Sequence, residues 1–275
     1  MSSRWSDLDR PPLDGRGLAR DLAGTMWRDL RVVEESESTN ADVAAAARAG
    51  APEGLVVVAE RQTAGRGRLG RTWTSPPRAG LTFSVLLRPQ VPPPRRSLVP
   101  LLAGLAVAEA VTAIGRLDVR LKWPNDLLDA AGGRKLAGIL AEAVALPDGD
   151  AVVVGTGLNV TTRADELPDE RAGSLLLAGA AVTDRTSLLK ELLRAFDRRY
   201  IAWVRAAGSA ESVLPAYREV CETIGRRVRL ELPAGAHVVG TATSVDDDGR
   251  LRLRTDDGAE QSWAAGDVVH LRPEG

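Results

Sequence analysis

The sequence contains only one cysteine and two histidines in 275 residues. The single cysteine, Cys221, excludes an intramolecular disulfide and a multi-cysteine zinc or iron–sulfur site, and it fits a reducing compartment. Two histidines leave little material for a Ser-His-Asp triad or a histidine-ligated metal centre. The 36 basic and 37 acidic residues give a net charge of −1, so the molecule as a whole is not a polycation.

The sequence also lacks the marks of secretion and of membrane insertion. Its first ten residues are rich in charge and are not followed by an apolar run, which excludes a secretory signal. The most apolar stretch, Leu98–Ile114, is interrupted by Pro100 and Glu109 and is shorter than the ~20 residues that a membrane span needs. We therefore expect a buried helix there, in a cytoplasmic protein that has no membrane partner.

Three regions of the sequence differ in pattern. Residues 1–28 form a tail with many prolines and glycines and one short helix, which is too small for a helix-turn-helix domain. Residues 29–224 mix helix and strand patterns, and the run Val152–Val154 is apolar on both strand faces, so helices must cover the sheet. Residues 225–275 change to period-two strands joined by Asp-Gly turns. The expected fold is α/β, a mixed sheet covered by helices, with a small five-stranded C-terminal β-barrel.

An arginine-rich stretch has no acidic residue to balance it. Between Glu60 and Glu109 there are eight arginines, and at their centre Gly65–Arg71 reads G-R-G-R-L-G-R. Glycine lets the backbone approach a ligand closely, and arginine offers forked donors to phosphate or carboxylate. The stretch predicts an anion site, with a flexible surface loop as the alternative. Dinucleotide and P-loop motifs are excluded, because Thr72–Pro77 cannot form the helix that both require.

Three further motifs contain polar or glycine residues at strand ends. Lys122–Asp126 reads K-W-P-N-D, and Arg134–Leu140 reads R-K-L-A-G-I-L, with Lys135 at the start of a strand. Gly155–Asn159 reads G-T-G-L-N at the end of a buried strand. Taken singly, each motif is explained equally well by turn chemistry. Two of the chain's three lysines lie here, and arginine cannot replace lysine where a compact ammonium is required.

Together with Ser38-Thr39-Asn40 and Gly65–Arg71, these motifs resemble those of the biotin protein ligases, the biotin-[acetyl-CoA-carboxylase] synthetases. The resemblance runs from about Leu30 to Arg272, and the order of its four motifs makes it specific. It implies a class II synthetase-like catalytic domain followed by an SH3-like C-terminal domain. Many relatives also carry an N-terminal DNA-binding domain. We expect a monofunctional ligase without that domain and without a DNA partner.

The resemblance also implies a reaction. The carboxylate of biotin attacks the α-phosphate of ATP, which gives biotinoyl-5′-AMP and pyrophosphate. A lysine of an apo biotin carboxyl carrier protein domain, in acetyl-CoA or acyl-CoA carboxylase, then attacks the mixed anhydride. ATP with Mg²⁺ is the co-substrate, no cofactor is permanently bound, and the protein is a monomer or a weak homodimer. Because an anionic nucleophile meets a polyanion, the protein must supply positive charge and positioning.

The same resemblance implies roles for individual residues. Lys135 and Arg68 are the catalytic candidates, and Lys135 would bridge the biotin carboxylate and the α-phosphate. The biotin-binding candidates are Ser38, Thr39, Asn40, Gln62, Gly65, Arg66, Gly67, Arg68, Lys135, Gly138, Gly155 and Gly157. The nucleotide-binding candidates are Arg68, Arg71, Trp73, Asn125, Lys135 and Asn159. No direct metal ligand is assigned, and Asp126 is the candidate for an outer-shell partner of Mg²⁺.

Two other functions fit parts of the sequence. A lipoate or octanoyl ligase or transferase of the same superfamily shares the central lysine strand but lacks the G-R-G-R-x-G-R run. A nucleic-acid-binding module would explain an arginine-rich loop beside a small barrel. The acidic turns at Asp246–Asp248 and Asp256–Asp257 leave that module without an extended basic face. Thr161–Leu177 offers no aromatic residue to stack on adenine, so the adenine contacts stay unassigned.

Overall fold

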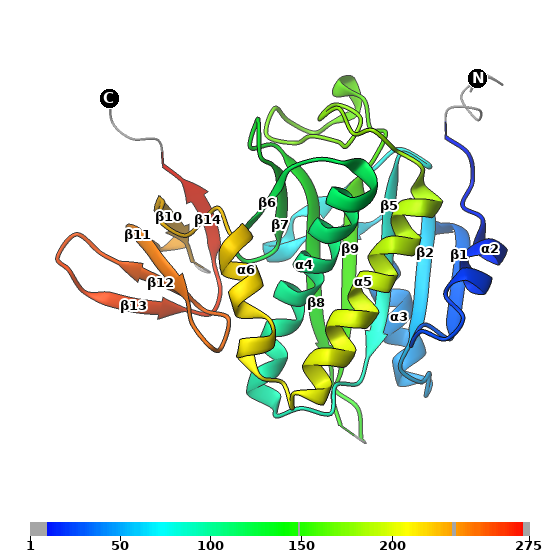
Figure 1. The fold of residues 1–275 in the computed structure, drawn as a ribbon, viewed down its shortest axis with the longest axis horizontal. Coiled ribbons are helices and arrows are strands. Elements are labelled where there is room, and N and C mark those ends of the chain that lie inside the picture. The colour runs from blue at the N-terminus through cyan, green and yellow to red at the C-terminus, as the bar shows by residue number, and fades with distance from the viewer. Residues whose placement is uncertain (1–9, 148, 233–234, 272–275) are drawn as a thin grey trace.

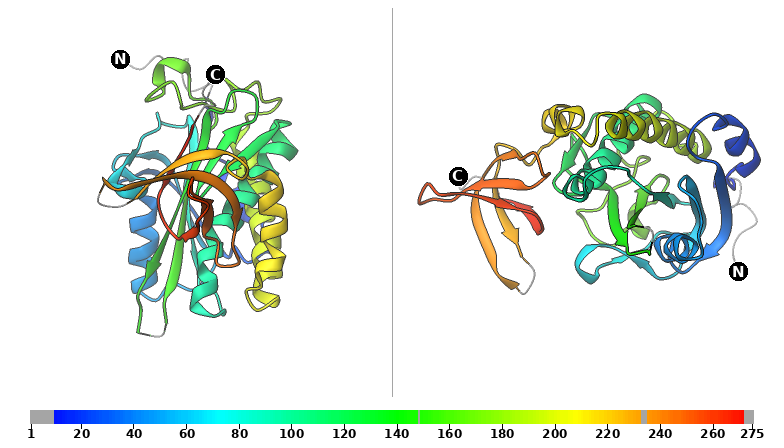
Figure 2. Two further views of the ribbon diagram at one scale, coloured as in Figure 1. Left: turned by 90° about the vertical axis from the view of Figure 1, so that its left-hand side faces the viewer. Right: turned by 90° about the horizontal axis from the view of Figure 1, so that it is seen from below.

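A computed structural model describes residues 10–147, 149–232 and 235–271. A large sheet covered by helices makes up most of the molecule, and a smaller antiparallel sheet stands beside it (Figure 1). Helices α4 (Val99–Ala110) and α5 (Arg185–Arg205) cover one face of the large sheet, and α3 (Thr39–Arg48) covers the other (Figure 2). The predicted mixed α/β fold, a sheet covered by helices, is confirmed.

The large sheet combines one parallel strand pair with antiparallel pairs. Strands β1 and β2 are parallel, because the chain returns between them through α3. All other neighbouring strands are antiparallel. In spatial order the strands are β1 (Asp29–Ser36), β2 (Leu55–Gln62), β5 (Gly80–Leu87), β9 (Ala151–Asn159), β8 (Lys135–Val144), β7 (Asp126–Asp129) and β6 (Val119–Lys122).

The start of α3 is fixed by a capping residue. Ser38 Oγ accepts a hydrogen bond of 3.4 Å from the backbone N–H of Ala41, and the helix stops just before Gly50, which has a left-handed φ of 90°. This cap puts Thr39 and Asn40 in the first turn, where both are buried. Two polar candidates of the sequence analysis are therefore held rigidly at one end of the sheet.

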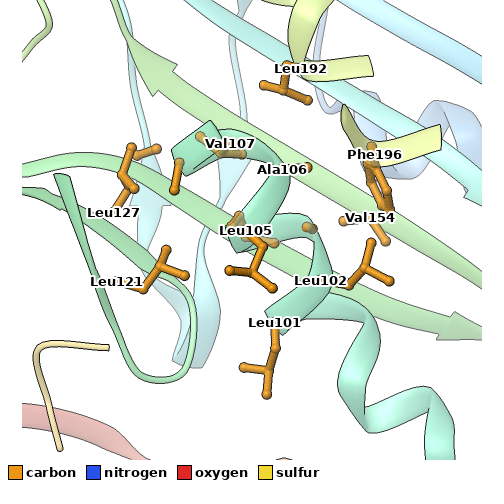
Figure 3. Packing of buried hydrophobic residues seen from close by; sticks show 14 of the residues in the cluster. Leu101, Leu102, Leu105, Ala106, Val107, Leu121, Leu127, Val154, Leu192 and Phe196 are labelled. Atoms are coloured by element: carbon orange, nitrogen blue, oxygen red, sulfur yellow. The ribbon is translucent and has the colours of Figure 1, made fainter. Parts of the chain in front are cut away.

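Helix α4 is apolar apart from Glu109, and it lies in the largest cluster of buried side chains. With the helical turns before and after it, it forms a segment, Pro93–Gly115, long and apolar enough to cross a membrane by length and composition. However, 72% of its most apolar window is buried inside the protein. Leu102 of this helix belongs to the same cluster as Val154 of β9 and Phe196 of α5 (Figure 3). The α-helix itself is shorter than the predicted Leu98–Ile114, the whole helical segment is longer, and the burial is as predicted.

The smaller sheet contains five antiparallel strands, as the Asp-Gly turns predict. Two short helices remain: α2 (Gly15–Asp21) precedes the large sheet in the chain, and α6 (Leu214–Val220) precedes the smaller sheet. The five strands, in spatial order, are β13 (Glu260–Trp263), β12 (Leu251–Arg254), β11 (His237–Val245), β10 (Arg227–Glu231) and β14 (Asp267–His270).

The smaller sheet is joined to the end of β6 by hydrogen bonds. Trp123 is buried and donates its indole N–H to the carbonyl of Gly249 at 3.0 Å. The backbone N–H of Trp123 donates to Thr223 Oγ1 at 3.0 Å, and the same hydroxyl lies 3.2 Å from His270 Nε2. The K-W-P-N-D segment is thus in direct contact with the smaller sheet, and this junction brings residues of β14 toward the polar end of the large sheet.

We expect His270 to make the protein less stable in mild acid. Its burial, with Lys122 and Arg226 nearby, lowers the pKa of its imidazole to about 4. The unfolded chain binds this proton first, so the stabilisation is complete above pH ~6.5 and is lost as the pH falls toward 4. The loss should be about 1–2 kcal/mol of unfolding free energy, allowing for screening at a half-buried ring.

Urea unfolding at pH 7.5 and at pH 4.5 measures this difference. His270→Gln should lose less stability between the two pH values than the parent does. His237→Gln is the matched control, because His237 lies in the same sheet and is exposed. An equal pH dependence in the parent and in His270→Gln would show that His270 makes no such contribution.

Candidate functional site

A pocket lies where the N-terminus of α3, the strands β8 and β9, and the glycine- and arginine-rich segment 65–73 meet. Most residues singled out from the sequence line this one pocket. They are Ser38, Thr39, Asn40, Gln62, Arg66, Gly67, Arg68, Arg71, Trp73, Asn125, Asp126, Lys135, Gly138, Gly155 and Gly157. Motifs that are far apart in the chain therefore form one site, which favours the functional interpretation of each motif over turn chemistry alone.

Six further residues line the pocket that were given no role from the sequence. Ile139, Leu140 and Thr156 lie within the motifs quoted above. Thr72 belongs to the glycine- and arginine-rich segment, Thr82 of β5 lies opposite Gly157, and Asp267 comes from β14 of the smaller sheet. The six are Thr72, Thr82, Ile139, Leu140, Thr156 and Asp267. Strand periodicity could have indicated the strand residues, because side chains alternate between the two faces of a sheet.

The glycines of β8 and β9 form part of the pocket wall. Gly138 and Gly157 are paired across the two strands, and a side chain on Gly157 would come within 2.3 Å of the Trp73 ring. A side chain on Gly155 would come within 2.1 Å of Asn40 Oδ1. Glycine is needed at these two positions because the side chains of Trp73 and Asn40 lie against the backbone there.

The polar end of the pocket is organised by a buried serine of β5. Ser84 Oγ lies 2.7 Å from Thr39 Oγ1 and donates to Asn40 Oδ1 at 2.6 Å. Asn40 Nδ2 in turn donates to Glu142 Oε2 at 2.5 Å. Both polar ends of the Asn40 amide therefore have protein partners. Ser84 was missed by motif analysis, although a lone serine within an apolar strand is a signal that a buried hydroxyl has a partner.

Gln62 reaches the same end of the pocket from β2. Its Oε1 accepts a hydrogen bond of 3.0 Å from the backbone N–H of Thr39. Its Nε2 lies so close to Gly65 that an added Cβ there would be 2.2 Å away. Gly65 itself lines an adjoining groove instead of this pocket. Gln62 therefore connects the capped helix to the start of the arginine-rich segment.

The segment 65–73 forms a small hairpin instead of an open loop. Strands β3 (Gly65–Arg66) and β4 (Thr72–Trp73) pair in antiparallel fashion around the turn Arg68–Gly70. Leu69 at the tip has a left-handed φ of 53° and a 53% exposed side chain. We call residues 65–73 the Gly-Arg hairpin. Its arginines are presented to the pocket by a hairpin that covers it.

Four cationic and two anionic side chains meet at the other end of the pocket. Lys135 Nζ lies 2.7 Å from Asp126 Oδ1 and 6.0 Å from the centre of the Trp73 ring. Burial lowers the pKa of Arg68, and it does the same to the pKa of Lys122 of β6. With Arg71 and Asp267 these groups leave an excess of positive charge, which suits a polyanionic ligand.

The Gly-Arg hairpin also touches the smaller sheet. Arg71 forms an ion pair with Asp267, and Arg68 donates to the carbonyl of Gly266 at 3.4 Å. The sequence motifs gave no indication of this contact, because Asp267 belongs to no motif and is far from the hairpin in the chain.

Two asparagines among the candidates are bound to the backbone. Asn125 lines the pocket, and its Nδ2 donates to the carbonyl of Ile139 at 2.9 Å. Asn159 does not line the pocket and donates to the carbonyl of Gly173 at 2.9 Å. Lys135 and Gly173 are also joined by a backbone hydrogen bond of 2.8 Å. Asn159 therefore holds the segment after β9 against the strand that carries Lys135.

In the described part of the chain, no three His, Cys, Asp or Glu side chains come together as a metal site would require. The two carboxylates of the pocket, Asp126 and Asp267, are each paired with a cation. The indole N–H of Trp73, in the Gly-Arg hairpin, has no such partner: its Nε1 is buried and has no hydrogen-bond acceptor among the described residues. It is a donor available to a ligand in the pocket.

Two family models match the sequence. Residues 33–159 match the biotin/lipoate A/B protein ligase family, and residues 223–271 match the biotin protein ligase C terminal domain. The chain is 48% identical over 273 residues to the biotin–[acetyl-CoA-carboxylase] ligase of Mycobacterium tuberculosis, covering 97% of this chain and 98% of that protein. It is 34% identical over 218 residues to the bifunctional ligase/repressor BirA of Escherichia coli, covering 78% and 66%.

Solved structures agree with these matches. The biotin protein ligase from Aquifex aeolicus in complex with biotin and ATP is similar with a TM-score of 0.74 and 29% identity, over 89% of this chain and 99% of that chain. The biotin protein ligase from Leishmania major in complex with biotin is similar with a TM-score of 0.59 and 27% identity, over 86% and 98%. The likeness covers both sheets.

Proposed function

Because this chain belongs to the biotin protein ligase family, we propose that it activates biotin with ATP and transfers it to a lysine of a biotin carboxyl carrier protein domain. One observation carries this proposal: Lys135 and the arginines of the Gly-Arg hairpin line the same pocket as Thr39 and Gln62. One end suits an uncharged polar head, and the other suits a carboxylate beside a phosphate.

The first step forms a bond between the biotin carboxylate and the α-phosphate of ATP. A carboxylate oxygen attacks phosphorus, the bond to the β-phosphate breaks, and pyrophosphate leaves with its negative charge. Mg²⁺ enters with ATP and neutralises part of the phosphate charge. The protein's own task is to hold two anions together, which fixed cations in a partly dry site do well.

The ureido head of biotin binds at the polar end. Ser38, Thr39 and Gln62 supply hydroxyl and amide groups there, and Asn40 orients the Thr39 hydroxyl through Ser84. Gly138 and Gly157 let the Trp73 ring pack closely against the sheet, where it can lie beside the ring system of biotin. The Gly-Arg hairpin, in which Arg66 and Gly67 precede the turn, then covers the bound ligand.

Lys135 acts at the reacting atoms. In the free protein its ammonium is paired with Asp126. When the substrates bind, this compact ammonium contacts both the biotin carboxylate and the α-phosphate instead. Arg68 and Arg71 bind phosphate oxygens, and the indole N–H of Trp73 donates to the nucleotide. Asn125 supports the nucleotide subsite, and Asn159 supports it indirectly by holding the segment beside Lys135.

The second step needs no nucleophile from the enzyme. The neutral amine of the carrier lysine attacks the carbonyl carbon of biotinoyl-5′-AMP, the bond to the phosphate oxygen breaks so that AMP leaves, and the nitrogen loses a proton to water as the amide forms. The acceptor domain belongs to acetyl-CoA or acyl-CoA carboxylase. We propose that the described part of residues 29–224 is a class II synthetase-like catalytic domain, and that the described part of residues 225–275 is an SH3-like barrel. The reaction takes place in the cytoplasm, and the protein acts without DNA as a monomer or a weak homodimer.

A transfer assay with alternative acids tests this function. The protein, ATP, Mg²⁺ and an apo biotin carboxyl carrier domain are incubated with biotin, lipoate or octanoate, and the carrier is weighed by mass spectrometry. We expect addition of one biotinoyl group and none of the other acyl groups. Transfer of lipoate or octanoate in preference to biotin would assign the chain to the other branch of the superfamily.

We expect the Gly-Arg hairpin to be protected by its ligands. Its arginines repel one another when no anion is bound, and its tip is exposed at Leu69. Trypsin should therefore cut after Arg66, Arg68 or Arg71 in the free protein, and at least several-fold more slowly with biotin plus ATP. Cleavage after the exposed Arg116 is the internal control and should keep its rate. Equal hairpin cleavage in both states would count against ligand-induced closure.

A further inference from the structure

An acidic residue of the smaller sheet lies inside the candidate site without a role in the chemistry proposed above. Asp267 begins β14, lines the pocket and forms an ion pair with Arg71. Its side chain is only 13% exposed, whereas that of Arg71 is 62% exposed. A carboxylate this buried requires a cation. Asp267 is therefore the fixed side of the pair, and the exposed arginine side chain is the one that this pairing orients.

The turn that carries Asp267 is closely packed. Gly266 has a φ of 149°, and a Cβ on it would lie 2.6 Å from Leu230 Cδ1. Its carbonyl accepts the hydrogen bond from Arg68, so the same turn holds two arginines of the Gly-Arg hairpin. Ala264, just before this turn, lines the groove beside the hairpin. The smaller sheet thus presents a rigid acceptor edge to a hairpin that has little support of its own.

We propose that Asp267 is a positioning residue of the nucleotide subsite, which holds the Arg71 guanidinium in place for the phosphates of ATP. The guanidinium has five donors, so one edge can bind Asp267 while the other remains open to a phosphate oxygen. Arg71 then meets the nucleotide already oriented. The conformational entropy of its long side chain is already lost in the free protein, so binding of ATP does not have to supply it.

Charges around the pair agree with this geometry. Asp126 is already paired with Lys135, so it does not compete for Arg71. Lys122 faces the cluster from β6, and Asp267 is one of the negative groups that act on it and on Arg68. Asp267 therefore keeps the arginines from spreading apart, which their mutual repulsion would otherwise favour.

The expected effect is on ATP binding more than on turnover. Asp267→Asn should raise the KM for ATP about three- to tenfold, with kcat and the KM for biotin changed less than twofold. Asp267→Glu keeps the charge, so its KM for ATP should be close to that of the parent. Asp256→Asn is the matched control, because Asp256 is an exposed, arginine-paired carboxylate of the same sheet, and it should leave all three constants unchanged.

A double-mutant cycle with Arg71→Ala separates positioning from a merely structural role. If Asp267 acts through Arg71, Asp267→Asn should change the KM for ATP less than twofold in the Arg71→Ala background. Equal effects of Asp267→Asn in both backgrounds, or an unchanged KM in the single variant, would overturn the proposal. Thermal unfolding of each variant shows whether it is folded.

This inference rests on the proposed function, and the parent protein separates the two. Biotin-dependent pyrophosphate release by the parent is measured first, in the assay that also gives the KM for ATP of the variants. If the parent releases none, the proposed function fails. If the parent is active and Asp267→Asn behaves as the parent does, only the role of Asp267 fails.

Discussion

Lys135→Ala should lose at least about 10²-fold of the rate of biotinoyl-5′-AMP formation, as removal of a fixed transition-state donor does. Lys135 is the ammonium group that lines the pocket, and its Nζ lies 2.7 Å from Asp126 Oδ1. Without it, two anions must approach each other beside an uncompensated carboxylate. The first-turnover rate of pyrophosphate formation, with saturating biotin and ATP, measures the loss.

Two further variants make this result specific. Lys190→Ala removes another of the chain's three lysines, one that pairs with Asp21 on α2 outside the pocket, and it should keep the parent rate. Lys135→Arg keeps a positive charge beside Asp126, so it should fold normally while still losing much of the rate, because a guanidinium is not a compact ammonium. A full rate in Lys135→Ala would remove Lys135 from the mechanism.

Arg68→Gly should make the intermediate leak from the enzyme. Arg68 is partly buried and ties the Gly-Arg hairpin to the carbonyl of Gly266. The change removes this donor and adds backbone freedom, so the hairpin opens more often over the reactive anhydride. We expect the variant to form biotinoyl-5′-AMP and to label lysines of bystander proteins at least tenfold more than the parent does. A tenfold increase corresponds to a loss of about 1.4 kcal/mol in the free energy that holds the intermediate on the enzyme.

Biotinylation of serum albumin, compared at equal adenylation rate, measures the leak. Arg116→Gly is the matched control, because Arg116 is exposed, lies outside the pocket and has a left-handed φ of 53° that glycine accepts. That variant should label albumin no more than the parent does. Unchanged albumin labelling by Arg68→Gly would show that other residues retain the intermediate.

The residues of the pocket could be found from the sequence where they belong to contiguous motifs. The Gly-Arg hairpin, the lysine strand and the capped start of α3 each carry a local signal, and the fold brings these together. Asp267 carries none, because it is a single acid at the start of a strand. Ser84, a serine in a buried strand, indicates that its hydroxyl has a partner but does not indicate which one. Such contacts depend on tertiary packing, which no local pattern encodes.

The layers of the fold were also predictable, and some details were not. Apolar runs such as Val152–Val154 require burial on both faces, which predicts the covering helices. The pairing of β3 with β4 was missed, because a segment of glycine and arginine has little strand propensity. Asn159 was expected at the nucleotide, yet its amide binds the carbonyl of Gly173, a partner that only the three-dimensional structure reveals.

The most direct test of the central claim is a single-turnover measurement of pyrophosphate in the absence of carrier protein. The protein, in known concentration, is mixed with ATP, Mg²⁺ and excess biotin, and pyrophosphate is followed with time. Because the closed pocket retains the intermediate, we predict a burst of about one pyrophosphate per chain that requires biotin, followed by slow release, and fast turnover once an apo carrier domain is added. Pyrophosphate release that does not depend on biotin, or no release at all, would contradict the account.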